Sequence, residues 1–217
     1  MATIELKKLR KANRPLAKLV RTLMPWTTFF REFVKHPAMV GSIIPSSPAL
    51  VRAVLDPVNW NETRLFVEYG PGVGTFTRPV LDRLRPDAML LAIDTNRDFV
   101  RYLNGDIADH RFRAVHGSAE DVRQIIADHG FAQADYILSG LPFSTLPEGV
   151  GEIIAVETNA ALRPGGAFLA YQYSTYVRRI LDPVFDYVED GFEWLNIPPC
   201  RIFWAHKDEL QVQTKAA

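Results

Sequence analysis

The stretch Leu65-Phe-Val-Glu-Tyr-Gly-Pro-Gly-Val-Gly-Thr-Phe-Thr77 decides the fold. Its first five residues are mostly apolar and predict a buried strand, and the turn that follows contains Gly70, Gly72 and Gly74. Glycine is required where a turn is tight and where the backbone must approach a ligand closely. The sequence therefore predicts a strand, a glycine-rich ligand-binding loop and then a helix.

The same alternation of strand and helix continues along the chain. We expect strands at 64–69, 88–94, 112–116, 134–139 and 167–173, with helices near 75–85, 96–108, 119–129 and 148–162. This spacing predicts right-handed βαβ units and hence a Rossmann-like α/β fold with a mostly parallel sheet. After a helix near 175–188, segments 193–197 and 201–206, separated by two prolines, predict an antiparallel C-terminal hairpin.

The N-terminal region, residues 1–48, differs in charge from the remainder of the chain, residues 49–217. Residues 1–24 carry seven basic side chains and one acidic one, although the whole chain has a formal net charge of zero. Apolar residues recur there at helical spacing, and an aromatic-rich segment follows up to residue 34. Cationic amphipathic helices of this kind bind anionic membranes. We expect residues 1–34 to contact an anionic membrane surface; packing on the sheet or covering the site is the alternative.

The composition limits the compartment and the chemistry. The single cysteine, Cys200, has no partner for an internal disulfide or a metal site, so we expect a reducing compartment and no metal. No apolar run is long enough to span a membrane. These features predict a cytoplasmic protein that lies peripherally on the inner face of the cell membrane.

The loop itself indicates which ligand it takes. Dinucleotide sites use G-x-G-x-x-G, whereas this loop is G-x-G-x-G and follows Glu68 and Tyr69. A carboxylate at Glu68 repels a pyrophosphate but suits a cation, and S-adenosylmethionine carries a sulfonium and an ammonium group. Asp94 ends the second strand, where a carboxylate accepts the ribose hydroxyls. An N-cap role for Asp94 is the alternative.

The ends of the remaining strands complete the predicted cofactor site. At the third strand, Ser118, Ala119 and Glu120 are expected beside the adenine; a plain helix cap is nearly as well supported. At the fourth, the segment 139–143 is expected beside the methyl group, because ligands bind at the carboxyl ends of such strands. The further cofactor contacts expected along these turns are Thr75, Thr95, Ser139, Gly140 and Leu141.

Taken in order, these motifs resemble the class I S-adenosylmethionine-dependent methyltransferases and, within them, the bacterial phospholipid N-methyltransferases, which are related to the ribosomal-RNA adenine dimethylases. The segments that carry the resemblance are 29–40, GSIIPSSPAL (41–50), VEYGPGVGTFT (67–77), AIDTN (92–96), HGSAED (116–121), ILSGLPF (137–143) and YQYSTY (171–176).

The resemblance implies a seven-stranded sheet. It also implies methylation of phosphatidylethanolamine, and of its mono- and dimethyl forms, towards phosphatidylcholine. The loop before the first strand would cover the cofactor through Ile43, Ile44, Ser46 and Ser47.

The acceptor is indicated by the end of the fourth strand. Enzymes that methylate adenine amino groups have Asn or Asp there, followed by two prolines and an aromatic residue, whereas this chain has Ser139-Gly-Leu-Pro-Phe143. The serine weakens a nucleobase interpretation. By the resemblance, the SGLPF segment is a mark of the lipid enzymes, so no nucleic-acid partner is expected. Two alternatives remain: an RNA adenine-N6 methyltransferase that uses the basic arm to bind RNA, and an inactive membrane-binding protein that keeps the cofactor.

Methyl transfer to an amine imposes one chemical requirement. An alkylamine has a pKa of about 10, so it must lose a proton before it attacks the methyl group. The candidates for contact with the amine are Ser139, Tyr171, Tyr173 and Tyr176, with Tyr173 and Tyr176 favoured. Arg178 and Arg179 are candidates for the lipid phosphate. Packing for the tyrosines and solvated helix charges for the arginines are the alternatives.

Overall fold

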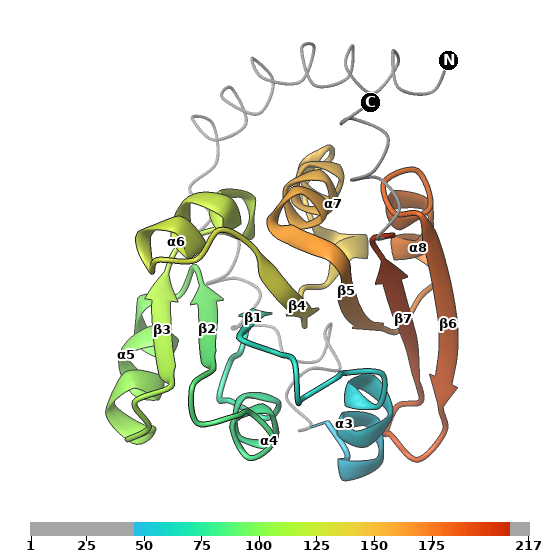
Figure 1. Cartoon of the computed structure of the whole chain (residues 1–217). Coiled ribbons are helices and arrows are strands. Elements are labelled where there is room, and N and C mark those ends of the chain that lie inside the picture. Colours follow the sequence, from blue (N-terminus) through green and yellow to red (C-terminus); the bar gives the residue numbers. More distant parts are fainter. Residues whose placement is uncertain (1–45, 209–217) are drawn as a thin grey trace, which may run out of the picture. The chain divides into compact units, whose positions relative to one another are not determined.

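The computed structural model describes residues 46–208 (Figure 1). The predicted membrane-binding helices of residues 1–34, and Ile43 and Ile44 in the covering loop, lie outside the described residues. Within 46–208, no helix combines the length and the apolar character that a membrane span requires.

A seven-stranded sheet forms the middle layer, with strand order β3-β2-β1-β4-β5-β7-β6. Neighbouring strands are parallel from β3 to β5, and β7 is antiparallel to both β5 and β6. The strands are β1 (Leu65–Tyr69), β2 (Met89–Asp94), β3 (Phe112–His116), β4 (Ala134–Ser139), β5 (Leu162–Gln172), β6 (Tyr187–Glu193) and β7 (Cys200–His206). The predicted fold class is therefore confirmed.

Helices cover both faces of the sheet (Figure 1). One face carries α3 (Pro48–Leu55), α4 (Thr77–Leu81) and α5 (Arg97–Asp106), and the other carries α6 (Val122–Asp128), α7 (Val150–Ala161) and α8 (Tyr176–Leu181). Two 3-10 turns, η2 (Ala119–Asp121) and η3 (Phe143–Thr145), follow β3 and β4. Because both faces are covered, all five residues of β1 are buried, as expected for a central parallel strand.

The C-terminal hairpin differs from its prediction. Its first strand is β6, not 193–197, and the helix expected over 175–188 ends at Leu181. The apolar residues 194–197 form the loop between the strands instead. The sequence of β6, YVEDGFE, is polar because this strand lies at the sheet edge and pairs on one side only. The apolar segment that predicted a strand is therefore the loop, and the strand itself is polar.

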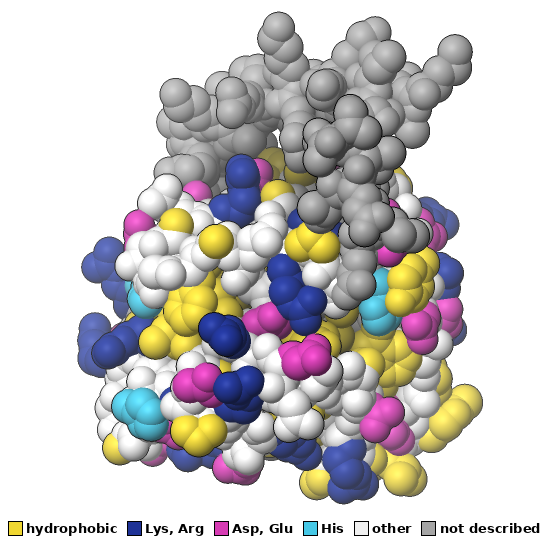
Figure 2. Space-filling view, viewed as in Figure 1, with side chains coloured by type: hydrophobic (Ala, Val, Ile, Leu, Met, Phe, Trp, Pro, Cys, Tyr) yellow, Lys and Arg dark blue, Asp and Glu magenta, His cyan; other side chains and the backbone are white. Residues whose placement is uncertain are grey.

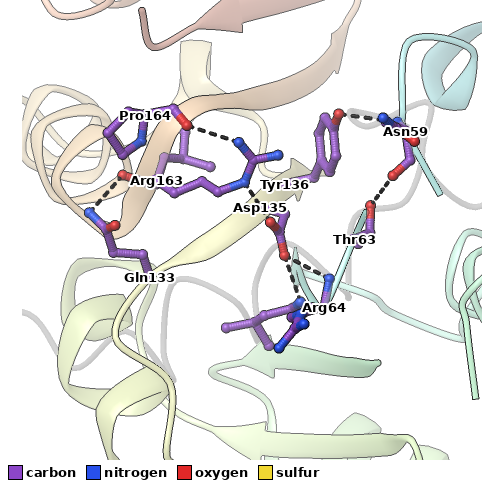
Figure 3. A network of polar contacts seen from close by, with 10 residues as sticks. Asn59, Thr63, Arg64, Gln133, Asp135, Tyr136, Arg163 and Pro164 are labelled. Atoms are coloured by element: carbon purple, nitrogen blue, oxygen red, sulfur yellow. Dashed lines mark hydrogen bonds and ion pairs between the residues drawn. The ribbon is translucent and has the colours of Figure 1, made fainter. Parts of the chain in front are cut away.

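A buried carboxylate joins the three central strands at their amino ends (Figure 3). Asp135 accepts hydrogen bonds from the backbone N–H groups of Arg64, at 2.8 Å, and Leu65, at 2.9 Å, and from Nε of Arg163, at 2.6 Å. These contacts link the starts of β1, β4 and β5. They stabilise the edge of the sheet opposite the glycine loop. In this fold, ligand-binding loops follow the carboxyl ends of the strands, at the other edge.

Candidate cofactor and acceptor site

The glycine loop follows β1 and uses a backbone conformation that other residues rarely adopt. Gly70, Gly72 and Gly74 have φ values of 62°, 55° and 87°. A Cβ atom added to Gly72 meets no atom within 4 Å, so the backbone conformation, and not crowding within the chain, requires glycine there. The loop is fixed at its start, where the Gly70 N–H donates to the Ile93 carbonyl at 3.0 Å. The structure thus holds a rigid turn with an open side.

Glu68, two residues before this loop, is a buried carboxyl group with 3% of its surface exposed. The Thr77 hydroxyl on α4 donates to its Oε2 at 2.7 Å. Burial raises the pKa of Glu68 to about 7, with a smaller upward contribution from Asp94, while the Thr77 hydrogen bond opposes the rise. A cation placed beside this carboxyl would favour its ionised form. The geometry therefore fits the cationic ligand expected from the sequence.

Asp94 links the end of β2 to the glycine loop. Its carboxylate accepts from the backbone N–H of Asn96 at 2.7 Å and from that of Gly72. Burial raises the pKa of Asp94, and these two hydrogen bonds oppose the rise. The N-cap of α5 is Asn96, whose side chain accepts from the Asp98 N–H, so the alternative role for Asp94 as the cap is wrong. The ribose contact stays a prediction.

The turn after β3 is a helix cap in this structure. Oγ of Ser118 accepts from the Glu120 N–H at 3.2 Å and its hydroxyl donates to Oε2 of Glu120 at 3.1 Å. Ala119 is buried. The capping alternative is thus observed for Ser118, and contact of this turn with adenine stays a prediction.

The segment after β4 is a compact turn whose polar groups are satisfied. Ser139 is fully buried, and its Oγ accepts from the Leu141 N–H at 3.1 Å. The Leu141 carbonyl accepts from Nε2 of Gln172 at 2.8 Å, and the Gly140 N–H donates to the Tyr69 carbonyl at 3.1 Å. Because the serine hydroxyl binds its own backbone, this turn presents no side chain like the Asn or Asp that holds a nucleobase amino group.

Of the three candidate tyrosines, Tyr171 is the one beside both loops. A Cβ atom on Gly140 would lie 2.5 Å from its hydroxyl, and its ring stacks on Phe76 with centroids 4.8 Å apart. Its hydroxyl also hydrogen-bonds the Ser46 side chain. Burial, with Glu68 nearby, raises the pKa of Tyr171 well above its usual value, so the phenol stays neutral. A neutral phenol and not a phenolate therefore lies at this point, and its contact with an amine stays a prediction.

The other residues predicted to contact the lipid acceptor follow Tyr171 in the sequence. Tyr173 follows the end of β5 and is 49% exposed, and Tyr176 begins α8. Arg178 forms ion pairs with Asp182, at 3.5 Å, and with Asp190 on β6, whereas Arg179 is exposed. Contact of these groups with a lipid stays a prediction, and the ion pairs of Arg178 compete with a phosphate.

Three side chains change the set of site residues that the sequence predicted. Tyr69 directs its hydroxyl away from the loop, to Thr158 on α7 at 3.1 Å, so only its backbone borders the site. Thr77, which holds Glu68, was not predicted, although it ends the stretch that identifies the fold. Asn196 was also missed: its Oδ1 accepts from the Ser47 N–H at 2.9 Å, and no pattern in the surrounding sequence indicates this contact.

Comparison with known proteins identifies the family. An ornithine lipid N-methyltransferase of Singulisphaera acidiphila is 32% identical over 182 residues, which cover 81% of this chain and 93% of that protein. The chain belongs to the lipid N-methyltransferases. The resemblance inferred from the sequence motifs is confirmed at this level. No protein-family model matches the chain.

Solved structures agree on the fold of this lipid N-methyltransferase. A precorrin-6y C5,15-methyltransferase of Geobacter metallireducens superposes with a TM-score of 0.57 at 14% identity, covering 73% of this chain and 88% of that one. Human methyltransferase-like protein 13, solved with S-adenosylhomocysteine, gives 0.55 at 14% identity, covering 75% and 82%. The cofactor is S-adenosylmethionine. Glu68, Asp94 and the glycine backbone are the residues that fit it.

Proposed function

We propose that this lipid N-methyltransferase methylates the primary amine of an amino lipid at a membrane surface, and that ornithine lipid is its first acceptor. Similarity over most of the chain to an ornithine lipid N-methyltransferase carries the proposal. The turn after β4 supports it, because Ser139 is fully buried and stands where enzymes that methylate adenine have an Asn or Asp for the base amino group. Phosphatidylethanolamine, favoured by the SGLPF motif, is the second candidate.

The chain's own residues have two tasks in this reaction, which are to orient the cofactor and to position the amine. S-adenosylmethionine supplies an electrophilic methyl group when it is bound. Glu68 and Asp94 provide negative charge and hydrogen-bond acceptors at the ends of β1 and β2, which orient the cofactor. Tyr171 stands where the glycine loop meets the turn after β4, so its hydroxyl can accept a hydrogen bond from the incoming amine.

In this scheme the alkylammonium loses its proton to water before it attacks, so no strong base is needed. Tyr171 remains a neutral phenol because its pKa is raised, so it positions the amine and does not deprotonate it. The reactive species is then the neutral fraction of the lipid amine, which rises with pH and reaches one half at about pH 10. We therefore expect most of the rate to come from positioning and exclusion of water.

A competition assay tests the acceptor. The full chain is incubated with labelled S-adenosylmethionine and vesicles that contain equal amounts of ornithine lipid and phosphatidylethanolamine, and the lipids are separated before counting. We expect label in ornithine lipid first. Label in phosphatidylethanolamine alone makes that lipid the acceptor, and label only in added RNA overturns the proposal.

A further inference from the structure

The loop between β6 and β7, residues 194–199, presents apolar side chains to solvent. Trp194 and Leu195 are each 74% exposed, and Ile197 is 73% exposed. Hydrophobic side chains stand out at the lower right of Figure 2, where Figure 1 shows the loop that joins β6 to β7. Isolated exposed apolar residues are ordinary, but three in one short loop indicate a surface that is covered in use.

The same loop is held firmly from the inside. Asn196, between the exposed residues, is 4% exposed, accepts from the Ser47 N–H at 2.9 Å and donates through Nδ2 to the Pro198 carbonyl at 2.8 Å. Glu193 accepts from the Leu195 N–H at 2.7 Å. The loop therefore displays its apolar side chains from a fixed backbone, with its one buried polar side chain pointing inward.

This loop lies at the edge of the sheet where the site is. Gln172, the last residue of β5, pairs with Arg201 of β7, so the hairpin loop stands at the carboxyl end of β5. Asn196 also hydrogen-bonds the Tyr173 side chain, and the neighbouring Ser46 hydrogen-bonds Tyr171. The loop thus contacts Tyr173 directly through Asn196, and it binds Ser47, the chain neighbour of the Ser46 that contacts Tyr171.

We propose that the β6–β7 loop inserts Trp194, Leu195 and Ile197 into the lipid bilayer and so brings the site to the amine of its substrate. The inference rests on the proposed function, because a lipid amine lies at the headgroup level and must reach the carboxyl edge of the sheet. Trp is the residue type that favours the membrane–water interface, and Leu and Ile favour the acyl region.

The base of the loop carries one cation, Arg201, and one carboxylate, Glu193. The Arg201 guanidinium lies over the Phe192 ring, 5.5 Å from its centroid, and Phe192 packs against Trp194 at 4.3 Å. A cation just behind an inserted aromatic side chain is at the depth of lipid phosphates. Three exposed apolar side chains in one loop suit a fluid bilayer, which adapts to their shape, whereas a protein partner would need a matching surface.

A local probe tests insertion. Leu195→Cys is labelled with an environment-sensitive fluorophore in the full chain, and Cys200 stays unlabelled because it is buried and its thiol pKa is raised to about 12. The control is Tyr187→Cys, exposed at the other end of β6 and roughly 20 Å away along the strand. Neutral phosphatidylcholine vesicles containing the amino lipid should shift the emission of the first label to the blue and leave that of the second unchanged. Equal responses overturn the inference.

A functional comparison separates this inference from the proposed function. Trp194→Ser/Leu195→Ser should lower methyl transfer to vesicle lipid by about tenfold or more at limiting lipid, because each buried side chain adds to the partitioning. The double variant should still methylate a short-chain amino lipid below its micelle concentration at the wild-type rate. Its cofactor affinity should also be unchanged. Tyr187→Ser is the control variant and should match the wild type in every assay.

The outcomes distinguish the two claims. Insertion of Leu195 without transfer to any lipid refutes the proposed function alone, and transfer to lipid without insertion refutes the docking loop alone. If the double variant instead changes a dimer to a monomer and binds vesicles as before, the loop is a protein interface and the inference is wrong.

Discussion

Replacement of Glu68 by glutamine should make the ligand-free protein less sensitive to alkaline pH while weakening cofactor binding. The folded-state pKa of Glu68 is raised from 4.5 to about 7 by burial. A raised carboxyl pKa means that the folded state prefers the protonated form. Its favourable contribution is full below pH 4.5 and is lost as the pH rises through about 7.

The magnitude follows from this shift. One pKa unit corresponds to about 1.4 kcal/mol, so the raised pKa of Glu68 costs the folded state about 1 kcal/mol at pH 5.5 and about 3 kcal/mol at pH 8. Glutamine does not titrate and can still accept the Thr77 hydroxyl. Between the two pH values the wild type should therefore lose about 2 kcal/mol more unfolding free energy than Glu68→Gln.

Urea unfolding of both proteins at pH 5.5 and 8, without cofactor, measures this difference directly. Comparison of the two proteins removes the pH dependence of all other groups. S-adenosylhomocysteine and S-adenosylmethionine titrations should show weaker binding to the variant, by about thirtyfold for a lost charged contact of about 2 kcal/mol. Parallel stability curves, or unchanged cofactor affinity, would refute the role given to Glu68.

Three further substitutions test other parts of the account. Gly140→Ala should lower methyl transfer at least tenfold, because its Cβ would lie 2.5 Å from the Tyr171 hydroxyl. Adding Tyr171→Phe to this variant should restore packing, so the melting temperature should recover although full activity should not. Gly72→Ala should destabilise by about 1–2 kcal/mol in urea unfolding, since φ is +55° there; no change contradicts the backbone argument. Asp135→Ala should lower unfolding free energy by about 3 kcal/mol with unaltered cofactor affinity, and a changed affinity in the folded variant would show that the two sheet edges are coupled.

The sequence predicted the part of the fold that depends on local patterns. The strand LFVEY and the three glycines are recognisable because a buried parallel strand is continuously apolar and a positive φ restricts the residue type. The carboxylates Glu68 and Asp94 are recognisable by their positions at strand ends. These features predict the cofactor site from the sequence, and the structure brings Glu68, Asp94 and the glycine loop together.

The hairpin and its contacts were harder to predict because they depend on the rest of the sheet. The edge strand β6 has no hydrophobic alternation, and the apolar 194–197 segment looks like a strand although it is an exposed loop. The contact of Asn196 with Ser47 joins residues 149 positions apart and leaves no local signal. Likewise, only the end of β5 at Gln172 shows that Tyr171, and not Tyr173, is the tyrosine beside the glycine loop.

Mass spectrometry of the products tests the central claim most directly. The full chain is incubated with S-adenosylmethionine carrying a deuterated methyl group and vesicles of amino lipid, with added RNA in the same reaction and Glu68→Gln as the control for cofactor use. The account predicts deuterated methyl groups on the lipid amine, far fewer with the variant, and none in RNA. Label in RNA with unmodified lipid would contradict it.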